Sequence, residues 1–273
     1  MSITAADVNN LRKATGAGMM DCKNALVEAN GDFDAAVDIL RKKGQKVAAK
    51  RGDRDATEGL VIAKTNDSGS EGAIIVLNCE TDFVAKNDDF VNFANKIAEI
   101  ALNEKPADLD ELKSKQIDGM PISEKIIEQT GVIGEKIDLS KFAAVAADTV
   151  YAYNHPGNKI ASVVGLNKGG QVDAAKDVAM QIAAMDPIAV DKEGVAQDVI
   201  DREIEVGKDQ AIQEGKPTEM AEKIAMGRLN KFFKENTLLN QQYIKDNKKS
   251  IRDFLSDTEQ DLTVTEFKRF ALS

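Results

Sequence analysis

The chain has 273 residues, of which 42% are hydrophobic, 30% charged and only 5% aromatic, and its formal net charge is −10. This length indicates two or three modules, and the composition is ordinary for a globular protein. The acidic balance argues against broad contact with nucleic acid or an anionic membrane. Two cysteines and one histidine exclude a disulfide framework and a zinc site built from these residues alone.

The sequence shows no targeting or membrane segment. Its start, Met1–Thr4, has neither the basic nor the apolar region of a signal peptide. No apolar run approaches the ~20 residues that a membrane span needs. We therefore expect a cytoplasmic protein without membrane contact, in which Cys22 and Cys79 are buried or idle thiols.

Residues 1–44 predict three short helices. Thr4 begins a capping signal for the first helix, and Gly16 breaks it. Asp21 is expected to cap the second helix, and Gly44 is expected to end the third. Three helices in so short a segment predict a small bundle resembling ubiquitin-associated (UBA) domains.

A basic stretch runs from Arg41 to Arg54. It could be a solvated helix end, whose cations suit the helix dipole, or a patch that binds nucleic acid. Acidic residues interrupt the run, and no aromatic residue is interleaved for base stacking. The solvated helix end is therefore favoured, and an RNA-binding protein that uses residues 41–54 is the alternative.

The middle of the chain contains an internal repeat. Apolar runs at 59–63 and 73–78 predict two antiparallel strands, and a helical stripe spans 90–100. The same order recurs downstream. Matched strand positions of the two copies are separated by a constant number of residues, and matched helix positions by four residues fewer. The matched positions are Val61 with Val150, Leu77 with Leu166, Asn78 with Asn167, Ala94 with Ala179 and Ile97 with Ile182.

The difference in spacing places extra residues of the first copy within 79–87. An element that the second copy lacks is not needed to build the core, and loops often carry function. Here Phe83 and Val84 stand in a polar connection. They either fold back into the core or form an exposed apolar anchor for a partner. Asp82 is interpreted as a helix cap, with a catalytic acid as the alternative.

The remaining segments predict helices within 103–133, a strand at 137–146 and a closing strand at 264–270. Two long polar helices, 193–214 and 218–233, predict an antiparallel hairpin that projects about 30 Å from the body. The fold class is therefore α+β, with a UBA-like bundle, a duplicated antiparallel sheet-plus-helix core and a protruding helical hairpin. The expected domains are 1–53 (bundle), 54–145 (first core subdomain), 146–190 with 231–273 (second core subdomain) and 191–230 (hairpin).

No enzyme motif is found in the sequence. It lacks a phosphate-binding P-loop, a GxSxG nucleophile elbow, an HExxH metal motif and a CxxC pair. The single histidine, His155, precedes a Pro-Gly turn and is interpreted as a surface residue. A general base would need a nucleophile or an orienting carboxylate nearby, and the sequence indicates none. Met19 and Met20 are either core filler or a binding surface, and one of them should face outward.

Two long segments resemble signatures of the elongation factor Ts family. These are Leu11–Leu26, which reads LRKATGAGMMDCKNAL, and Leu77–Asn87, which reads LNCETDFVAKN. The repeat, the hairpin and the closing strand follow the family's order along essentially the whole chain. One departure is Gln242–Lys245, where some members of the family have an apolar pair.

The resemblance implies a guanine-nucleotide exchange factor that binds elongation factor Tu, dislocates Mg²⁺ and promotes GDP release. It implies no covalent chemistry, no cofactor, no bound metal and no direct contact with nucleic acid. It leaves a homodimer formed through the hairpin open. The residues that match partner contacts of the family are Arg12, Met19, Met20, Lys23, Thr81, Asp82, Phe83, Val84, Ile133 and His155.

Overall fold

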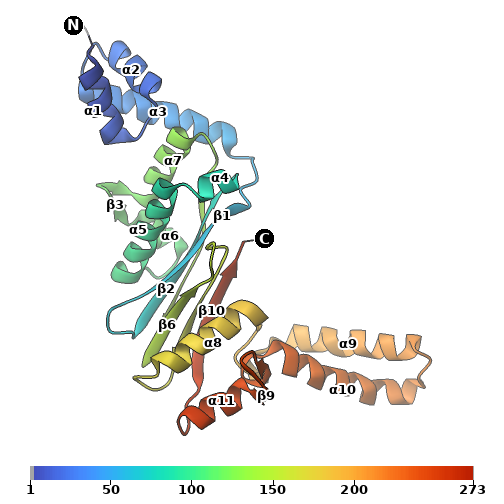
Figure 1. Ribbon diagram of the computed structural model, residues 1–273. Helices are drawn as coiled ribbons and strands as arrows, with labels where there is room; N and C mark the ends of the chain where they lie inside the picture. The colour runs from blue at the N-terminus through green and yellow to red at the C-terminus, as the bar shows by residue number, and fades with distance from the viewer. Residues whose placement is uncertain (1–2, 273) are drawn as a thin grey trace.

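The computed structural model describes residues 3–272. Its N-terminal module is a bundle of three helices, α1 (Ala5–Thr15), α2 (Met19–Glu28) and α3 (Phe33–Arg51), as predicted (Figure 1). The Thr4 hydroxyl accepts a hydrogen bond from the Asp7 amide at 3.2 Å, and the Asp7 carboxylate accepts one from the Thr4 amide at 2.9 Å. This reciprocal pair begins α1 as the sequence indicates.

Two helix boundaries predicted for this module are wrong. Helix α2 begins at Met19, with Gly18 as its N-cap. Asp21 therefore lies inside the first turn, and its carboxylate pairs with Lys43 of α3 instead of capping α2. Helix α3 does not end at Gly44 but continues to Arg51.

Gly44 lies inside α3 because that helix crosses α7 (Ile122–Ile133) at this point. A Cβ atom placed on Gly131 of α7 would lie 2.3 Å from the Gly44 Cα atom. A Cβ atom on Gly44 would lie 3.5 Å from its nearest neighbour, the Ile127 carbonyl oxygen. Gly44 thus serves the close approach of two backbones rather than the end of a helix.

The two copies of the predicted repeat form two three-stranded antiparallel sheets, in the orders β1-β2-β5 and β10-β7-β6. Their strands are β1 (Glu58–Thr65), β2 (Glu71–Cys79), β5 (Asp138–Ala146), β6 (Thr149–Asn154), β7 (Ile160–Leu166) and β10 (Val264–Ala271).

The strand registers confirm the duplication. Leu60 pairs with Leu77 in the first sheet, and Thr149 pairs with Leu166 at the matching place in the second. On its other side, Leu77 pairs with Leu139 of β5, and Leu166 pairs with β10. Strands β5 and β10 are therefore equivalent third strands, although they lie at very different distances along the chain.

The core has four layers, which are helix α5 (Asp88–Glu104), the two sheets and helix α8 (Val172–Met185). Alternate residues of β1 point in opposite directions, because successive side chains of a strand lie on opposite faces. Leu60 packs beneath α5, whereas Val61 packs with Val163 in a separate cluster between the sheets. Both faces of β1 are therefore buried.

The connection between the two copies runs through α6 (Leu109–Ser114), a small hairpin and α7. The strands of this hairpin, β3 (Gln116–Ile117) and β4 (Met120–Pro121), were not predicted from the sequence. Two residues are too few to produce a detectable alternation of apolar and polar side chains.

The predicted helical hairpin projects away from the sheets as α9 (Gln197–Gln213) and α10 (Thr218–Asn236) (Figure 1). The first helix begins four residues later than expected, because Lys192–Gly194 forms a separate 3₁₀ turn, η1. Small residues allow the helices to pack closely along their seam. The buried residues of the hairpin are Gly207, Ala211, Ala221, Ala225 and Leu229.

The chain then returns to the second core subdomain. It forms a 3₁₀ turn, a short strand pair and a helix before the closing strand β10. These are η2 (Leu238–Asn240), β8 (Gln242–Tyr243), β9 (Asp246–Ser250) and α11 (Ile251–Thr258). The α+β class is confirmed, and the four domain boundaries stay predictions.

Candidate functional site

A short helix distinguishes the first copy of the repeat from the second. In the first copy, α4 (Asp82–Ala85) lies between the end of β2 at Cys79 and the start of α5 at Asp88. In the second copy, β7 leads to α8 without an intervening helix. The extra residues indicated by the change of spacing therefore form a defined element at one end of the first sheet (Figure 1).

The two apolar residues of α4 have different surroundings. Phe83 has 82% of its surface exposed, more than any other large hydrophobic residue among 3–272. Val84 packs against the core of the first copy, and Ala85 is buried. The exposed-anchor hypothesis therefore fits Phe83, and the core hypothesis fits Val84. Val84 and Ala85 fix the helix to the body while Phe83 projects from it.

Asp82 is not a helix cap, contrary to the preferred interpretation of the sequence. It is the first residue of α4, and Thr81 occupies the N-cap position. The Asp82 carboxylate instead accepts a hydrogen bond from Lys86 at 2.6 Å. This bond is the main cause that lowers the pKa of Asp82. Burial opposes it, and the charges of Lys86 and Lys159 lower the pKa further.

The catalytic alternative for Asp82 gains no support from its neighbours. Its carboxylate is bonded to Lys86, and the His155 ring is bonded to the Tyr153 hydroxyl at 3.1 Å. The two candidate groups thus have separate hydrogen-bond partners. Between residues 3 and 272, no group of three or more histidine, cysteine or acidic side chains could hold a metal ion.

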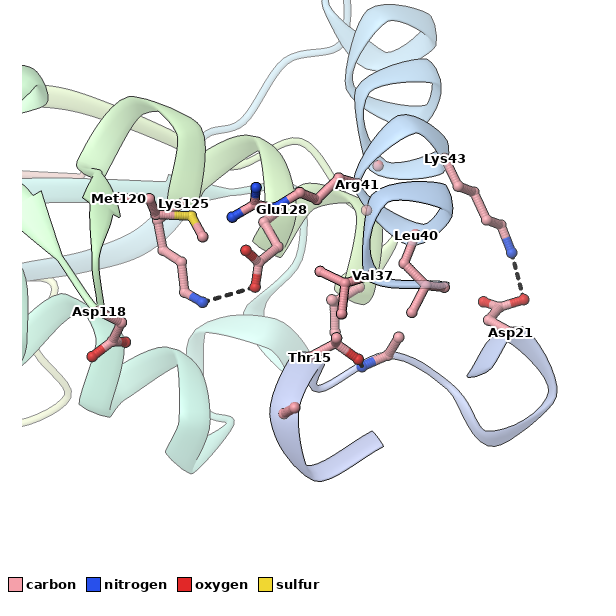
Figure 2. Close-up of a pocket in the computed structure, with 15 residues that line it drawn as sticks. Thr15, Asp21, Val37, Leu40, Arg41, Lys43, Asp118, Met120, Lys125 and Glu128 are labelled. Atoms are coloured by element: carbon pink, nitrogen blue, oxygen red, sulfur yellow. Dashed lines mark hydrogen bonds and ion pairs between the residues drawn. The ribbon is translucent and has the colours of Figure 1, made fainter. Parts of the chain in front are cut away.

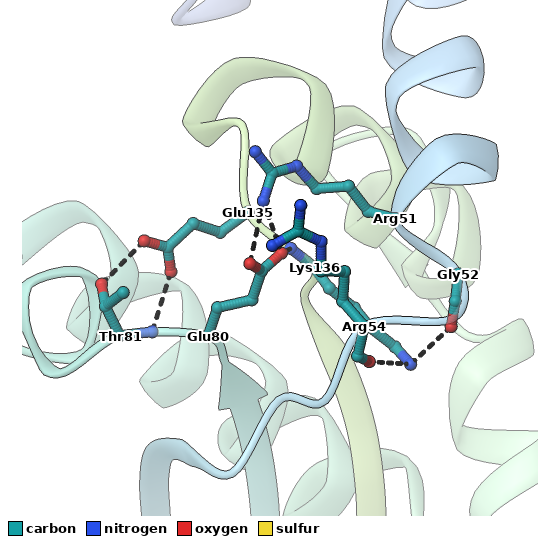
Figure 3. A network of polar contacts seen from close by, with 7 residues as sticks. All are labelled: Arg51, Gly52, Arg54, Glu80, Thr81, Glu135 and Lys136. Carbon is teal, nitrogen blue, oxygen red and sulfur yellow. Dashed lines mark hydrogen bonds and ion pairs between the residues drawn. The ribbon is translucent and has the colours of Figure 1, made fainter.

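A network of ion pairs and hydrogen bonds surrounds the base of α4 (Figure 3). Glu80 accepts two hydrogen bonds from Arg51 at 2.8 Å, which join the end of α3 to the end of β2. It also accepts one from the Lys136 amide at 2.6 Å. The bond from the Lys136 amide is the main cause that lowers the pKa of Glu80, followed by those from Arg51.

Glu135 completes this network from the segment after α7. Its carboxylate accepts a hydrogen bond from the Thr81 hydroxyl at 2.7 Å and another from the Thr81 amide at 3.0 Å. Lys136 meanwhile donates to the carbonyl groups of Gly52 and Arg54. Sequence patterns gave Arg51, Glu80 and Glu135 no individual role, because their partners lie between 29 and 56 residues away along the chain.

Phe83 stands at the edge of an open groove with a volume of about 940 Å³. The end of α1, helix α4, helix α5 and the end of α7 contribute its walls. Ile133, the last residue of α7, lines this groove together with Phe83 and Val84. The fold therefore brings two of the sequence-predicted segments, 81–84 and 133, to one place.

The N-terminal module presents its candidate residues to solvent. Met19 and Met20 are 60% and 64% exposed, so both face outward, whereas the sequence led us to expect this of one. The buried face of α2 begins one turn later, at Cys22, so neither methionine reaches the core of the bundle. Arg12 and Lys23 are also exposed.

A second, smaller cavity of about 320 Å³ lies where this module meets α7 (Figure 2). Thr15, Val37 and Leu40 line it from the bundle. From α7, Lys125 and Glu128 form an ion pair at 2.7 Å beside it. Its lining mixes both signs of charge with apolar groups and therefore favours no class of ligand. We interpret this cavity as a seam between two packed units.

His155 is a surface residue, as predicted, and lies in the turn between β6 and β7. This turn lies beside β1, because the Asn158 carbonyl accepts a hydrogen bond from the Val61 amide at 2.7 Å. Lys159, at its end, pairs with Glu58 at 2.9 Å. The tertiary structure thus places His155 next to the start of the first sheet, although it belongs to the second copy.

The thiols of the chain take no part in this surface. Both Cys22 and Cys79 are buried and unpaired. Burial raises the pKa of Cys79 to about 12, with a further contribution from the charge of Glu135. A thiol with so high a pKa stays protonated and unreactive at neutral pH, in agreement with the idle-thiol interpretation.

None of the helices within residues 3–272 is both long enough and apolar enough to cross a membrane.

The chain resembles proteins named elongation factor Ts along almost its whole length. It is 57% identical to the protein of Christiangramia forsetii over 99% of this chain and 98% of that one. It is 54% identical to the protein of Amoebophilus asiaticus, over 98% of each chain. The relative from Cytophaga hutchinsonii is 49% identical, over 100% of this chain and 99% of the other.

A sequence model of a protein family agrees with these relatives. The family described as elongation factor TS matches residues 80–273, which include α4, strand β5 of the first sheet, the whole second sheet and the helical hairpin. Helix α4, Glu80 and Glu135 thus lie in the matched region, whereas Arg51 precedes it. The chain belongs to the elongation factor Ts family, which implies a role in nucleotide exchange during translation elongation.

Proposed function

We propose that the chain binds the GDP-bound form of elongation factor Tu, displaces its Mg²⁺ and thereby promotes the release of GDP. The observation that carries this proposal is Phe83, an aromatic side chain 82% exposed on a helix that the second copy of the repeat lacks. Large aromatic residues dominate binding when they enter a partner's pocket. Phe83 would enter the GTPase beside its nucleotide site, with Asp82 next to it.

The proposed activity needs no covalent step, cofactor or metal ion held by this chain. An exchange factor binds best to a partner conformation in which the metal and phosphate sites are disturbed. By linkage, the exchange factor lowers the affinity of its partner for GDP, and GDP lowers the affinity of the partner for the exchange factor by the same ratio. The chain therefore shifts an equilibrium, and a broad surface is needed to supply the affinity for the disturbed state.

The positions of the other candidate residues support such a surface. Phe83 and Ile133 border one groove, and the exposed methionines of α2 lie on the adjoining N-terminal module. The turn that carries His155 lies at the start of the first sheet. We propose that Thr81 and Val84 contact the partner together with Phe83, and that residues around α4 complete the contact, namely Arg12, Met19, Met20, Lys23, Ile133 and His155.

Measurement of GDP dissociation from purified elongation factor Tu tests the proposal. The unmodified chain should accelerate GDP release. Phe83→Ala should slow the stimulated release at least about tenfold, because truncation of an aromatic anchor typically costs about 2 kcal/mol or more. Asp82→Ala should also slow it, and the double variant should lose most of the stimulation.

Val172→Ala is the matched control. Val172 is 54% exposed at the start of α8, which is the second copy's equivalent of α5. Its truncation should leave the stimulated release unchanged. Release that stays fast in the Asp82 and Phe83 double variant, with the fold retained by circular dichroism, would contradict the proposal.

The RNA-binding alternative is less consistent with the basic stretch as folded. Lys43 pairs with Asp21, and Arg51 donates both of its short hydrogen bonds to Glu80. We therefore propose no direct contact with nucleic acid. A gel-shift titration at low salt should show no binding, whereas binding that weakens steeply as salt rises would support the alternative.

We propose that any homodimer forms through the helical hairpin. Large apolar side chains stay exposed along it, namely Val206, Ile212, Met220 and Met226. Sedimentation equilibrium over a range of concentrations measures self-association directly. A dimer that persists after Met220→Glu and Met226→Glu would place the contact elsewhere on the molecule.

A further inference from the structure

We propose that Glu135 is a positioning residue for nucleotide exchange, whose carboxylate holds the backbone of Thr81 and so fixes the direction of Phe83. This inference rests on the function proposed above, and it concerns a residue outside the inserted helix. An anchor residue needs a fixed placement, and a helix as short as α4 does not provide it by itself.

Helix α4 has only four residues and cannot be stable alone, because a single helical turn does not repay its nucleation. Its N-cap residue, Thr81, makes no capping hydrogen bond with its own side chain. The Thr81 hydroxyl donates instead to Glu135, and the Thr81 amide donates to the same carboxylate. Glu135 therefore supplies, from a distant segment, the restraint that a local cap would give.

Glu135 is itself held in place by the end of α7. Gly134 ends that helix in the left-handed conformation with φ at 80°, and its amide donates to the Thr130 carbonyl at 2.9 Å. The next residue, Lys136, donates its amide to Glu80. Residues 134–136 and 80–81 thus hold each other through two carboxylates, one from each segment (Figure 3).

Phe83 depends on this restraint more than its neighbours do. Val84 and Ala85 are fixed by packing in the core, whereas Phe83 is 82% exposed and belongs to none of the core clusters. Its direction follows from the backbone on either side, and the preceding side is anchored at Thr81. A misplacement of about 1 Å in a positioned group can cost about a hundredfold in rate.

Glu135→Gln is the most informative substitution because it keeps the size and removes one acceptor. The two donors of Thr81 need two acceptor atoms, and a glutamine amide places an NH₂ donor against one of them. Thr81→Val removes the hydroxyl donor, and Thr81→Ser keeps it. Glu222→Gln is the control, because Glu222 forms an exposed ion pair with Lys208 on the distant hairpin.

The experiment measures GDP release from elongation factor Tu as a function of the concentration of each full-length variant. Glu135→Gln and Thr81→Val should lower the maximal release rate about tenfold and change the half-saturating concentration by less than about twofold. Glu222→Gln should behave like the unmodified chain, and Thr81→Ser should recover most of the maximal rate that Thr81→Val loses, because serine keeps the hydroxyl donor. A residue that only supported the fold would not produce this split between maximal rate and half-saturation.

Hydrogen exchange of the free chain provides the second measurement. Amides of residues 81–86 should exchange at least about tenfold faster in Glu135→Gln, while those of β1 and β2 keep their protection. If Phe83→Ala slows GDP release and Glu135→Gln does not, the positioning role is overturned and the proposed function stands. If Phe83→Ala has no effect on release, the proposed function fails. Unchanged hydrogen exchange at 81–86 in Glu135→Gln overturns the positioning role whatever the GDP release rates are.

Discussion

At the scale of single residues, the sequence located the inserted segment but not the direction of its side chains. Phe83 and Val84 are adjacent and similarly apolar, so no local pattern separates an exposed anchor from a core residue. The structure exposes the first and packs the second. The same limit applied to Asp82, whose partner proved to be Lys86, one turn later, rather than a free backbone amide.

The pairing of Asp82 with Lys86 gives a prediction at this scale. The hydrogen bond from Lys86 is the main cause of the lowered pKa of Asp82, so Lys86→Met should raise that pKa toward its ordinary value. A carbon-13 NMR titration of the Asp82 carboxyl group measures it. An unchanged titration would mean that the ion pair does not form in solution. Lys231→Met, at an exposed pair on the hairpin, is the control.

Glu80 gives a prediction about stability and pH. Its pKa is lowered in the folded chain, chiefly by the Lys136 amide. A lowered pKa contributes stability above the ordinary pKa of a glutamate, and that stability is lost as the pH falls through the lowered value. Glu80→Gln should therefore lower the unfolding midpoint at about pH 7, and this difference should shrink in acid as the pH falls below the ordinary pKa of a glutamate. A difference that is the same at neutral and acidic pH would contradict this assignment.

At the scale of elements, one glycine was a misleading signal. Gly44 was expected to end a helix and instead lies at the crossing of α3 and α7. A glycine needed for close packing and one needed for a turn look alike in sequence. Only the neighbour across the contact, Gly131, decides between them, and it lies on a different helix.

This crossing predicts an asymmetry between the two glycines. Gly131→Ala would place its Cβ atom 2.3 Å from the Gly44 Cα atom, whereas Gly44→Ala meets its nearest neighbour at 3.5 Å. Gly131→Ala should destabilise the chain by about 1–3 kcal/mol through overpacking, and Gly44→Ala by much less. Chemical denaturation measures both. Gly227→Ala on α10 meets nothing within 4 Å and is the control.

At the scale of the whole molecule, the duplication was visible in the sequence, but the packing of the copies against each other was not. The two sheets share a cluster of buried residues, and the Asn154 side chain donates to the Ala63 carbonyl at 2.9 Å and accepts from its amide at 2.8 Å. These contacts join the second copy to the first. The two copies should therefore unfold together.

Gly72 tests this coupling. A Cβ atom there would lie 2.6 Å from Val163 Cγ1 and 2.9 Å from Val150 Cγ1, both in the opposite sheet. Gly72→Ala should lower the free energy of unfolding by about 1–3 kcal/mol and speed hydrogen exchange in both sheets. Exchange that rises in the first sheet alone would show that the copies unfold separately. Gly169→Ala, whose Cβ atom would have 3.8 Å to its nearest neighbour, is the control.

The sequence by itself determined the α+β class, the duplicated strands, the extra connection in the first copy and the hairpin. Each of these follows from local periodicity, turn residues or spacing along the chain. Only the tertiary structure decided that Phe83 is exposed, that both methionines of α2 face solvent and that Glu135 holds Thr81. Exposure and polar pairing depend on which distant segments meet, and the glutamate at position 135 reaches its partner only after the chain has folded through α5, α6 and α7.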